Sequence, residues 1–190
     1  AFTSPKHTNR RTWCYRIQPS VCQSEFSHWS KPEIQTAPIN GICPHQALRW
    51  SPFPNINVDT DFVEGLMTIA GNGDARIQMG LSIHLYQTNR SMDKRYFYSA
   101  DGEILLVPVR GTMLIATELG NLRIGPGEIA VIPRGIKFQA DPLDGLATGY
   151  VAENYGAPLT LPERGPVGAN GFANERDFLY PLAALSLIHI

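Results

Sequence analysis

Histidines are the side chains of this 190-residue chain best suited to metal binding or acid–base catalysis, and their spacing favours neither role. His7, His28 and His45 lie in loop-like sequence, at no spacing typical of metal ligands. His84 stands in an alternating stretch, with no carboxylate or second histidine close to it in sequence. A histidine in that setting is usually a structural hydrogen-bonding residue. The sequence therefore predicts no catalytic, substrate-binding or metal-binding residue among them.

Eight residues in the stretch 96–138 nevertheless resemble the two spacing motifs of metal-binding cupin barrels. The first motif has two histidines one residue apart, then a glutamate and a glycine, and the second has glycine, proline and glycine before a third histidine. The matching positions are Tyr96, Tyr98, Glu103 and Gly111 for the first motif, and Gly127, Pro133, Gly135 and Phe138 for the second. The scaffold residues are retained, whereas an aromatic residue stands at all three histidine positions.

A single glutamate cannot hold a transition metal, which needs about three or more protein ligands. We therefore expect this barrel to be metal-free and filled by Tyr96, Tyr98 and Phe138, because a sheet of small diameter leaves little interior space. In the alternative, the three rings line an aromatic pocket for a small molecule.

Short apolar runs bounded by turn residues predict the elements that position these side chains. Residues 104–109, 112–117 and 129–133 are rich in Val, Ile and Leu and predict strands. Gly120-Asn121 predicts a hairpin turn between two of them, and Gly125-Pro126-Gly127 predicts another turn. Together with the cupin spacing, this predicts an all-β, cupin-like (RmlC-type) jelly-roll β-sandwich or barrel with long extended connections.

Further strands are expected on both sides of this stretch. Residues 61–70 predict a strand followed by a turn at 71–74, and residues 80–86 alternate Leu, Ile and Leu with Ser82, His84 and Tyr86. Residues 89–94 predict a polar loop, residues 141–149 a turn-rich link and residues 150–155 a last strand. Residues 21–46 show little periodicity and are interpreted as a long connection that gains order by lying on another element.

Composition and charge exclude several classes of function. An apolar fraction of 43% and a charged fraction of 17% are typical of a globular protein with a core, and a net charge of −1 gives no electrostatic footprint for nucleic acid or an anionic membrane. The basic cluster of Lys6, Arg10, Arg11 and Arg16 is interpreted as a solvated surface or subunit contact. No apolar run is long enough to span a bilayer.

The three cysteines, Cys14, Cys22 and Cys43, lack any CxxC spacing and indicate reduced thiols in a cytoplasmic protein, the alternative being one disulfide. No secretory signal is visible, but the first residue is Ala, so we expect the natural N-terminus to lie further upstream.

Six long stretches, in collinear order, are similar to the homogentisate 1,2-dioxygenase family. They read AFTSPKHTNRRTWCYRIQPSV, LRWSPFP, DFVEGLMTIAGNGD, GLSIHLYQTNRSM, YFYSADGEILLVPVRG and GPVGANGFANERDFLYP. The resemblance implies an enzyme that uses iron(II) and O₂ to open the ring of homogentisate, giving maleylacetoacetate in tyrosine and phenylalanine catabolism. It also implies two cupin-type domains per subunit and a hexamer built from trimers.

The resemblance further implies that this chain is an N-terminal-domain fragment. Residues 1–50 would form an incomplete extended arm, 51–160 the degenerate metal-free barrel, 161–184 a glycine-rich segment towards a second domain, and 185–190 an atypical tail. The family's iron ligands, two His and one Glu, belong to that second domain, so the chain alone is expected to bind no iron and to be inactive, serving as scaffold and oligomer contact. Tyr86 and Asn89 are the candidates for reaching the active site of a neighbouring subunit.

Three alternatives stay open. The run Gly165, Gly168 and Gly171 could cradle a phosphate, although it lacks the lysine of a P-loop and is better interpreted as a crossing segment. The chain could be a stand-alone, metal-free cupin that binds a small molecule. It could also be a non-catalytic paralogue that assembles with full-length subunits.

Overall fold

The computed structural model describes residues 19–39, 45–47, 49, 51, 56–162, 173–182 and 184. It divides into two compact units, Ala1–Lys31 and Pro32–Ile190. In the first unit the described residues include only the short 3-10 helix η1 (Ser20–Cys22) and exposed extended chain. The basic cluster, Cys14, Cys43, His7, the run Gly165–Gly171 and residues 185–190 lie outside the described residues.

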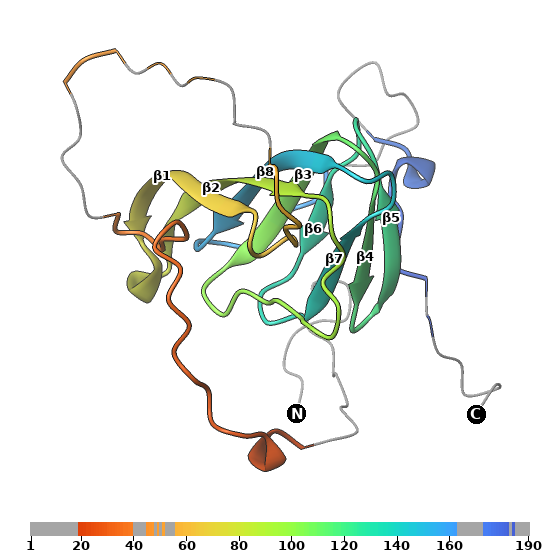
Figure 1. Cartoon of the computed structure of the whole chain (residues 1–190), viewed down its shortest axis with the longest axis horizontal. Coiled ribbons are helices and arrows are strands. Elements are labelled where there is room, and N and C mark those ends of the chain that lie inside the picture. Colours follow the sequence, from red (N-terminus) through yellow and green to blue (C-terminus); the bar gives the residue numbers. More distant parts are fainter. Residues whose placement is uncertain are drawn as a thin grey trace. The chain divides into compact units, whose positions relative to one another are not determined.

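The second unit contains two antiparallel sheets that face each other (Figure 1). The five-stranded sheet has the order β1-β2-β8-β3-β6 and the three-stranded sheet the order β5-β4-β7. The strands are β1 (Leu66–Asp74), β2 (Met79–Thr88), β3 (Glu103–Arg110), β4 (Met113–Thr117), β5 (Gly120–Ile124), β6 (Ala130–Ile132), β7 (Phe138–Pro142) and β8 (Ala147–Asn154). The 3-10 helices η2 (Ala75–Ile77) and η4 (Glu175–Asp177) complete the described elements of this unit.

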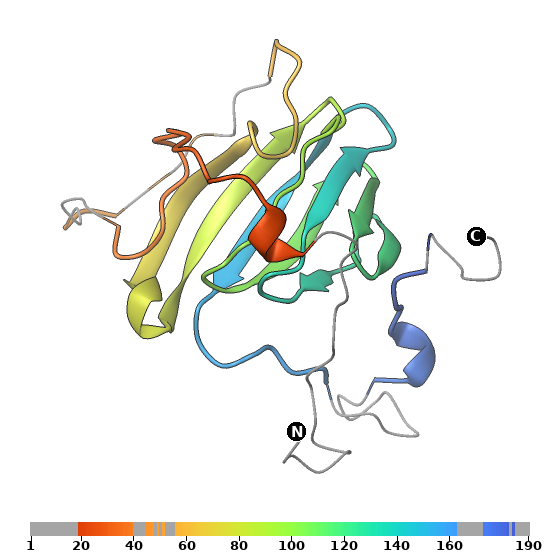
Figure 2. The ribbon, with the colours of Figure 1, turned by 90° about the horizontal axis from the view of Figure 1, so that it is seen from below.

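The insertion of β8 between β2 and β3 makes this arrangement a jelly roll rather than a simple meander. In Figure 2 the yellow β1, the yellow-green β2 and the blue β8 run side by side, although β8 comes more than fifty residues after β2 in the chain. The predicted all-β jelly roll is confirmed, and so are the strands predicted at 104–109, 112–117 and 129–133. This crossing brings residues from both ends of the barrel sequence to one interior wall.

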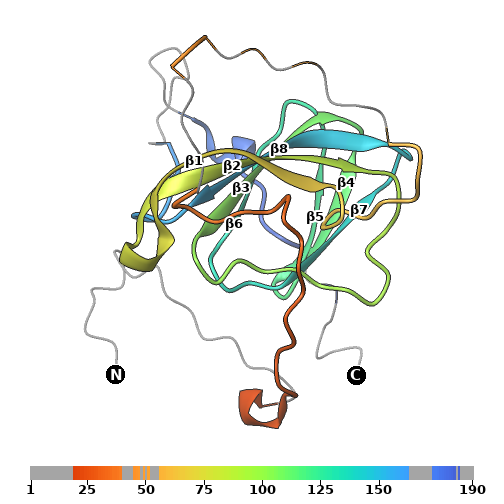
Figure 3. The same cartoon turned by 60° about the vertical axis from the view of Figure 1, so that its left-hand side comes forward.

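Two of the predicted turns are in the wrong place. Gly120 and Asn121 open strand β5, and the β4–β5 hairpin turns at Glu118 and Leu119 instead, since Thr117 pairs with Gly120. The region 71–74 lies within β1, and the chain turns through η2, at the tip of the β1–β2 hairpin in Figure 3. Residues 141, 142 and 147–149 likewise belong to β7 and β8, so the predicted turn-rich link is shorter than expected.

The glycines at the end of β1 are needed for backbone contact rather than for a turn. Gly73 pairs directly with Gly80, and both have positive φ, +87° and +97°. A Cβ atom at Gly80 would overlap the carbonyl of Asn72 on the facing strand. A glycine-rich stretch usually predicts a turn, which is why the sequence predicts one at 71–74. Glycine also occurs inside strands where two backbones approach closely, and this is its role in β1.

Substitution Gly80→Ala is expected to lower the free energy of unfolding by about 2–3 kcal/mol, because the methyl group adds overpacking to an unfavourable positive φ. Gly127→Ala is the matched control, since Gly127 has a similar φ of +93° but open space around it. It is expected to cost about 1 kcal/mol. Urea denaturation of both variants measures the difference, and equal losses would show that crowding at Gly80 contributes nothing.

The interior of the barrel combines an aromatic core with a polar wall. The ring centroid of Phe62 lies 5.3 Å from that of Tyr86 and 5.9 Å from that of Phe138, and Phe97 meets Phe138 edge-on at 5.7 Å. On β2, the alternating residues Ser82, His84, Tyr86 and Thr88 are buried, whereas Leu81, Ile83 and Leu85 lie on the outer face and are more exposed; Gln87, at the end of the strand, is buried as well. The polar side of the alternating stretch is therefore the interior side of this strand.

Segment 32–39 lies along the outer edge of β1. The amide of Thr68 donates to the carbonyl of Glu33 at 2.8 Å, and the amide of Ala75 donates to that of Ala37 at 3.1 Å. Ala37 is buried, and Ile34 packs against the main core. This part of the long connection gains its order from β1, as the sequence predicted.

Candidate functional site

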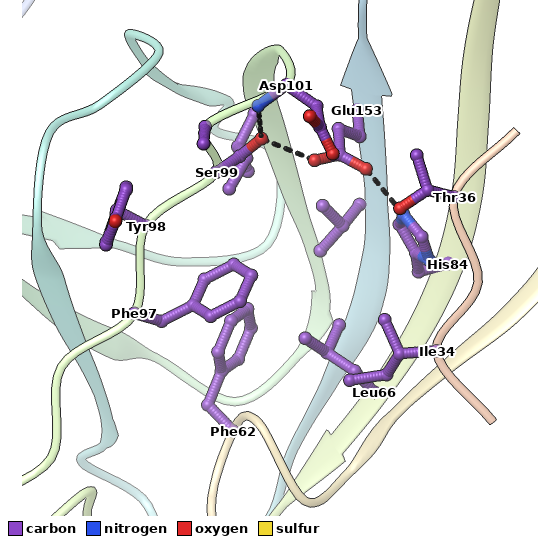
Figure 4. Close-up of a pocket in the computed structure, with 13 residues that line it drawn as sticks. Ile34, Thr36, Phe62, Leu66, His84, Phe97, Tyr98, Ser99, Asp101 and Glu153 are labelled. Atoms are coloured by element: carbon purple, nitrogen blue, oxygen red, sulfur yellow. Dashed lines mark hydrogen bonds and ion pairs between the residues drawn. The ribbon is translucent and has the colours of Figure 1, made fainter. Parts of the chain in front are cut away.

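A cavity of about 190 Å³ opens into the interior side of the five-stranded sheet (Figure 4). Its walls come from β1, β2, β3 and β8, from segment 32–39, from Phe62 in the turn before β1, and from segment 97–101, which precedes β3. The lining residues are Ile34, Thr36, Phe62, Leu66, His84, Phe97, Tyr98, Ser99, Ala100, Asp101, Ile104, Val151 and Glu153. In Figure 4 the aromatic and aliphatic side chains gather at one end and the polar ones at the other.

Glu153 is the centre of the polar end. Ser99 Oγ donates to its Oε1 at 2.5 Å, Tyr155 Oη lies 3.0 Å from its Oε2, and His84 Nε2 lies 3.6 Å from the same oxygen. The side chain of Glu153 is only 13% exposed. A carboxylate removed from water needs such hydrogen-bonding partners to stay ionised.

The strand register explains how these groups meet. Ser82 on β2 pairs with Glu153 on β8, and His84 is the next interior residue along β2. Tyr155 follows β8, and its hydroxyl also lies 2.7 Å from Ser82 Oγ. On the other side of β2, Thr68 pairs with His84, and its hydroxyl lies 2.8 Å from His84 Nδ1. The histidine is therefore held between Thr68 and Glu153 by three neighbouring strands.

Ser99 ties segment 97–101 to this wall. Besides donating to Glu153, its hydroxyl accepts the amides of Asp101 at 3.2 Å and Gly102 at 3.0 Å. Ser99 donates to Glu153 and not to His84, so these three residues do not form the serine–histidine–carboxylate chain of hydrogen bonds. The arrangement therefore orders the mouth of the cavity and is not a catalytic triad.

The environment shifts the pKa values of three groups at this end. Burial acts to raise the pKa of the Glu153 carboxyl, but hydrogen bonds from His84, Ser99 and Tyr155 outweigh it and hold that pKa below its ordinary value. Burial raises the pKa of the Tyr155 phenol to about 12. Burial and then the charge of Glu153 raise the pKa of the Asp101 carboxyl, although the charge of Arg134 opposes them.

The lowered pKa of Glu153 predicts how stability depends on pH. Because the folded state binds this proton more weakly than the unfolded state, the stabilisation is complete above the ordinary pKa of 4.5 and is lost as the pH falls through the folded value. Below about pH 4.5 the wild-type free energy of unfolding should fall more steeply than that of Glu153→Gln. The comparison is clearest when Asp101→Asn is present in both proteins, because the raised pKa of the Asp101 carboxyl makes stability depend on pH in the opposite direction. Parallel pH profiles with and without Glu153→Gln would contradict the prediction.

The residues singled out by the cupin spacing do not meet in the interior. Phe138 is fully buried, but Tyr96 is 64% exposed, and Tyr98 is one of the residues that line the cavity. The prediction that all three rings fill the barrel is therefore wrong for Tyr96. Phe97 points inward instead, because its backbone pairs with Phe138. Glu103 accepts the amide of Leu159 at 2.6 Å.

The described residues contain no group of three or more His, Cys, Asp or Glu side chains that could hold a metal ion. His28 and His45 are exposed. Among the described helices, none has the length and apolar character needed to cross a membrane.

Tyr86 cannot reach a neighbouring subunit, because it is 1% exposed and packs against Phe62. Its hydroxyl is buried without a hydrogen-bond partner, and burial raises the pKa of this phenol. Asn89 is half-buried and is used locally, since its side chain accepts the amide of Thr60 at 2.7 Å and donates to the carbonyl of Val58 at 3.2 Å. The prediction is wrong for Tyr86, and the amide of Asn89 has a structural role.

Sequence reasoning missed the pairing of His84 with Glu153. These residues are far apart in sequence, and only the insertion of β8 beside β2 makes them neighbours. One signal was available, because His84 and Ser82 alternate with apolar residues just as Glu153 and Val151 alternate with Tyr150 and Ala152. Two strands that each carry polar residues on one face are candidates for pairing so that these faces form one polar wall.

A small antiparallel jelly roll with an interior cavity at one end defines the class of cupin-type barrel domains. The chain belongs to the homogentisate 1,2-dioxygenase N-terminal family, whose model matches residues 1–187.

Two solved structures illustrate similar folds. An RmlC-like cupin protein with a double-stranded β-helix fold from Methanocaldococcus jannaschii has 16% identity and a TM-score of 0.40, with 57% of this chain and 93% of that one covered. A cupin-2 domain protein from Shewanella frigidimarina has 20% identity and a TM-score of 0.35, with 39% and 70% covered.

Proposed function

We propose that this chain forms the N-terminal domain of a homogentisate 1,2-dioxygenase. This enzyme would use iron(II) and O₂ to open the homogentisate ring to maleylacetoacetate, in the cytoplasmic breakdown of tyrosine and phenylalanine. The observation that carries the proposal is the family match over residues 1–187.

Within that enzyme, the domain would be a scaffold and not the iron site. A mononuclear iron oxygenase needs two histidines and one carboxylate with open positions. The interior of this barrel offers His84 and Glu153, one of each, and both are already engaged by Thr68, Ser99 and Tyr155. These residues do not fit iron, and no catalytic step is assigned to them. The iron would be held by a second domain.

A role in oligomer contact is supported by the outer face of the five-stranded sheet. An antiparallel sheet usually has one apolar and one polar face, but here apolar residues alternate outward as well. Paired rows include Leu85 with Tyr150 and Val107, and Ile83 with Ala152 and Leu105. Leu81 is 41% and Val131 38% exposed. We propose that this face contributes to the trimer or hexamer of the enzyme.

Iron content and turnover test the proposal. The 190-residue chain and the longer protein that contains it are loaded with iron(II) under argon, desalted and assayed for bound iron, homogentisate-dependent O₂ uptake and ring-opened product. The longer protein should bind about one iron per subunit and form product, and the chain alone should do neither. The longer protein with His84→Gln should bind as much iron as the unmodified one, which would show that His84 is not an iron ligand. One iron per isolated chain, lost in His84→Gln, would overturn the proposal.

A further inference from the structure

We infer that the cavity of this barrel binds a small aromatic ammonium ion, a single ring that carries one protonated amine. The inference rests on the shape and chemistry of the cavity and not on the proposed function. It assigns a ligand to a domain that would otherwise serve only as a scaffold.

The size of the cavity favours one ring. A closed apolar cavity of about 150 Å³ in a protein core takes up benzene. The cavity here, at about 190 Å³, leaves room for the same ring with one short substituent.

The inner end of the cavity suits the ring. Phe62 and Phe97 lie against it, and both pack on the buried ring of Phe138. Leu66 and Ile104 line the same end. Aromatic ligands gain both apolar burial and edge-to-face contact from such walls.

The outer end of the cavity suits a cationic donor. Glu153 and Asp101 both line it, and Figure 4 shows them beside each other. Three groups already engage Glu153, whereas no hydrogen bond or ion pair joins the Asp101 carboxylate to another described side chain. An ammonium group there would meet two carboxylates, one of which has open acceptor oxygens, and it would relieve their mutual repulsion, although the charge of Arg134 near Asp101 would oppose part of this attraction. A ligand with a carboxylate at this position would be repelled.

Calorimetric titration of the intact 190-residue chain at neutral pH tests this inference with three ligands of one shape. Benzylamine is the cation, benzyl alcohol the neutral equivalent and benzoate the anion. Benzylamine should bind at least about tenfold more tightly than benzyl alcohol, because its hydrogen bonds to the carboxylates are charge-assisted. Benzoate should show no binding. Equal affinities for the cation and the alcohol, or no binding of benzylamine, would overturn the inference.

Three variants locate the site. Asp101→Asn should weaken benzylamine about tenfold and leave benzyl alcohol unchanged, since it removes charge at the mouth alone. Asp144→Asn is the matched control, because Asp144 lies in the turn before β8, at the opposite end of that strand from Glu153, and it should change neither affinity. Ile34→Trp should fill the cavity and abolish binding of both ligands.

A measurement on the wild-type chain keeps the test independent of how Ile34→Trp folds. Benzylamine should shift the NMR signals of Phe97 and Ile104 and leave those of Leu119, on the β4–β5 turn, unchanged. Shifts confined to exposed residues, or equal effects of Asp101→Asn and Asp144→Asn, would place the amine on the surface and overturn the inference.

Discussion

Glu153→Ala is expected to lower the free energy of unfolding by about 3–5 kcal/mol, because it removes one partner of a set of buried, hydrogen-bonded groups. The change removes the shared acceptor of Ser99, Tyr155 and His84 and leaves these groups without their partner in a wall that water reaches poorly. Each buried group that loses its partner adds a desolvation penalty. Urea denaturation followed by circular dichroism measures the loss.

Two variants separate this effect from the simple loss of a carboxylate. Glu153→Gln keeps the shape and one acceptor oxygen, so its loss should be clearly smaller. Glu128→Ala removes an exposed carboxylate that accepts the amide of Gly125 at 2.7 Å, and it should cost no more than about 1 kcal/mol. If Glu153→Ala were as stable as Glu128→Ala, the polar wall would not be a structural element.

The strands of this barrel could be predicted from sequence because their signals are local. The apolar runs that form β3, β4 and β6 are each bounded by Gly, Pro, Asp or Asn, and the structure places strands there. The turns could not be placed from residue type alone, because glycine occurs both in turns and where two strand backbones approach closely. Gly120 and Gly73 have positive φ inside or beside paired strands, which the residue type alone does not distinguish from a turn.

The polar wall could not be predicted, because its members meet only through strand order. Nothing local indicates that β8 lies between β2 and β3, or that Ser82 pairs with Glu153. The alternation of β2 was recognised, but hydrophobicity favours the Leu and Ile side as the buried one. One side of the strand is apolar and the other carries hydrogen-bonded polar side chains. Either side can be buried, so periodicity alone does not tell which one faces inward.

The aromatic positions show the effect of an error of one residue. Motif spacing placed Tyr96 and Tyr98 in the barrel, but successive residues of an extended chain point to opposite sides. The pairing of Phe97 with Phe138 puts Phe97 inside and leaves Tyr96 exposed. When a residue departs from a family motif, the strand register in the structure must show which way its side chain points before a role is assigned to it.

Phe138→Ala is accordingly expected to lower the free energy of unfolding by about 3–5 kcal/mol, whereas Tyr96→Ala should change it by no more than about 0.5 kcal/mol. Phe138 is fully buried between Phe62 and Phe97, so its removal loses burial, two ring contacts and the volume of a ring. Tyr96, two-thirds exposed, loses little.

Phe138→Leu is the matched control for this prediction, because it keeps an apolar side chain and most of the volume, and its loss should be less than half that of Phe138→Ala. Since Phe97 and Phe62 contact Phe138 and also line the cavity, the cavity left by Phe138→Ala should join the ligand cavity and accept larger rings. Chemical denaturation of the three variants measures the stabilities. Equal losses for Phe138→Ala and Tyr96→Ala would mean that the motif spacing, and not the Phe97–Phe138 pairing, sets the interior of the barrel.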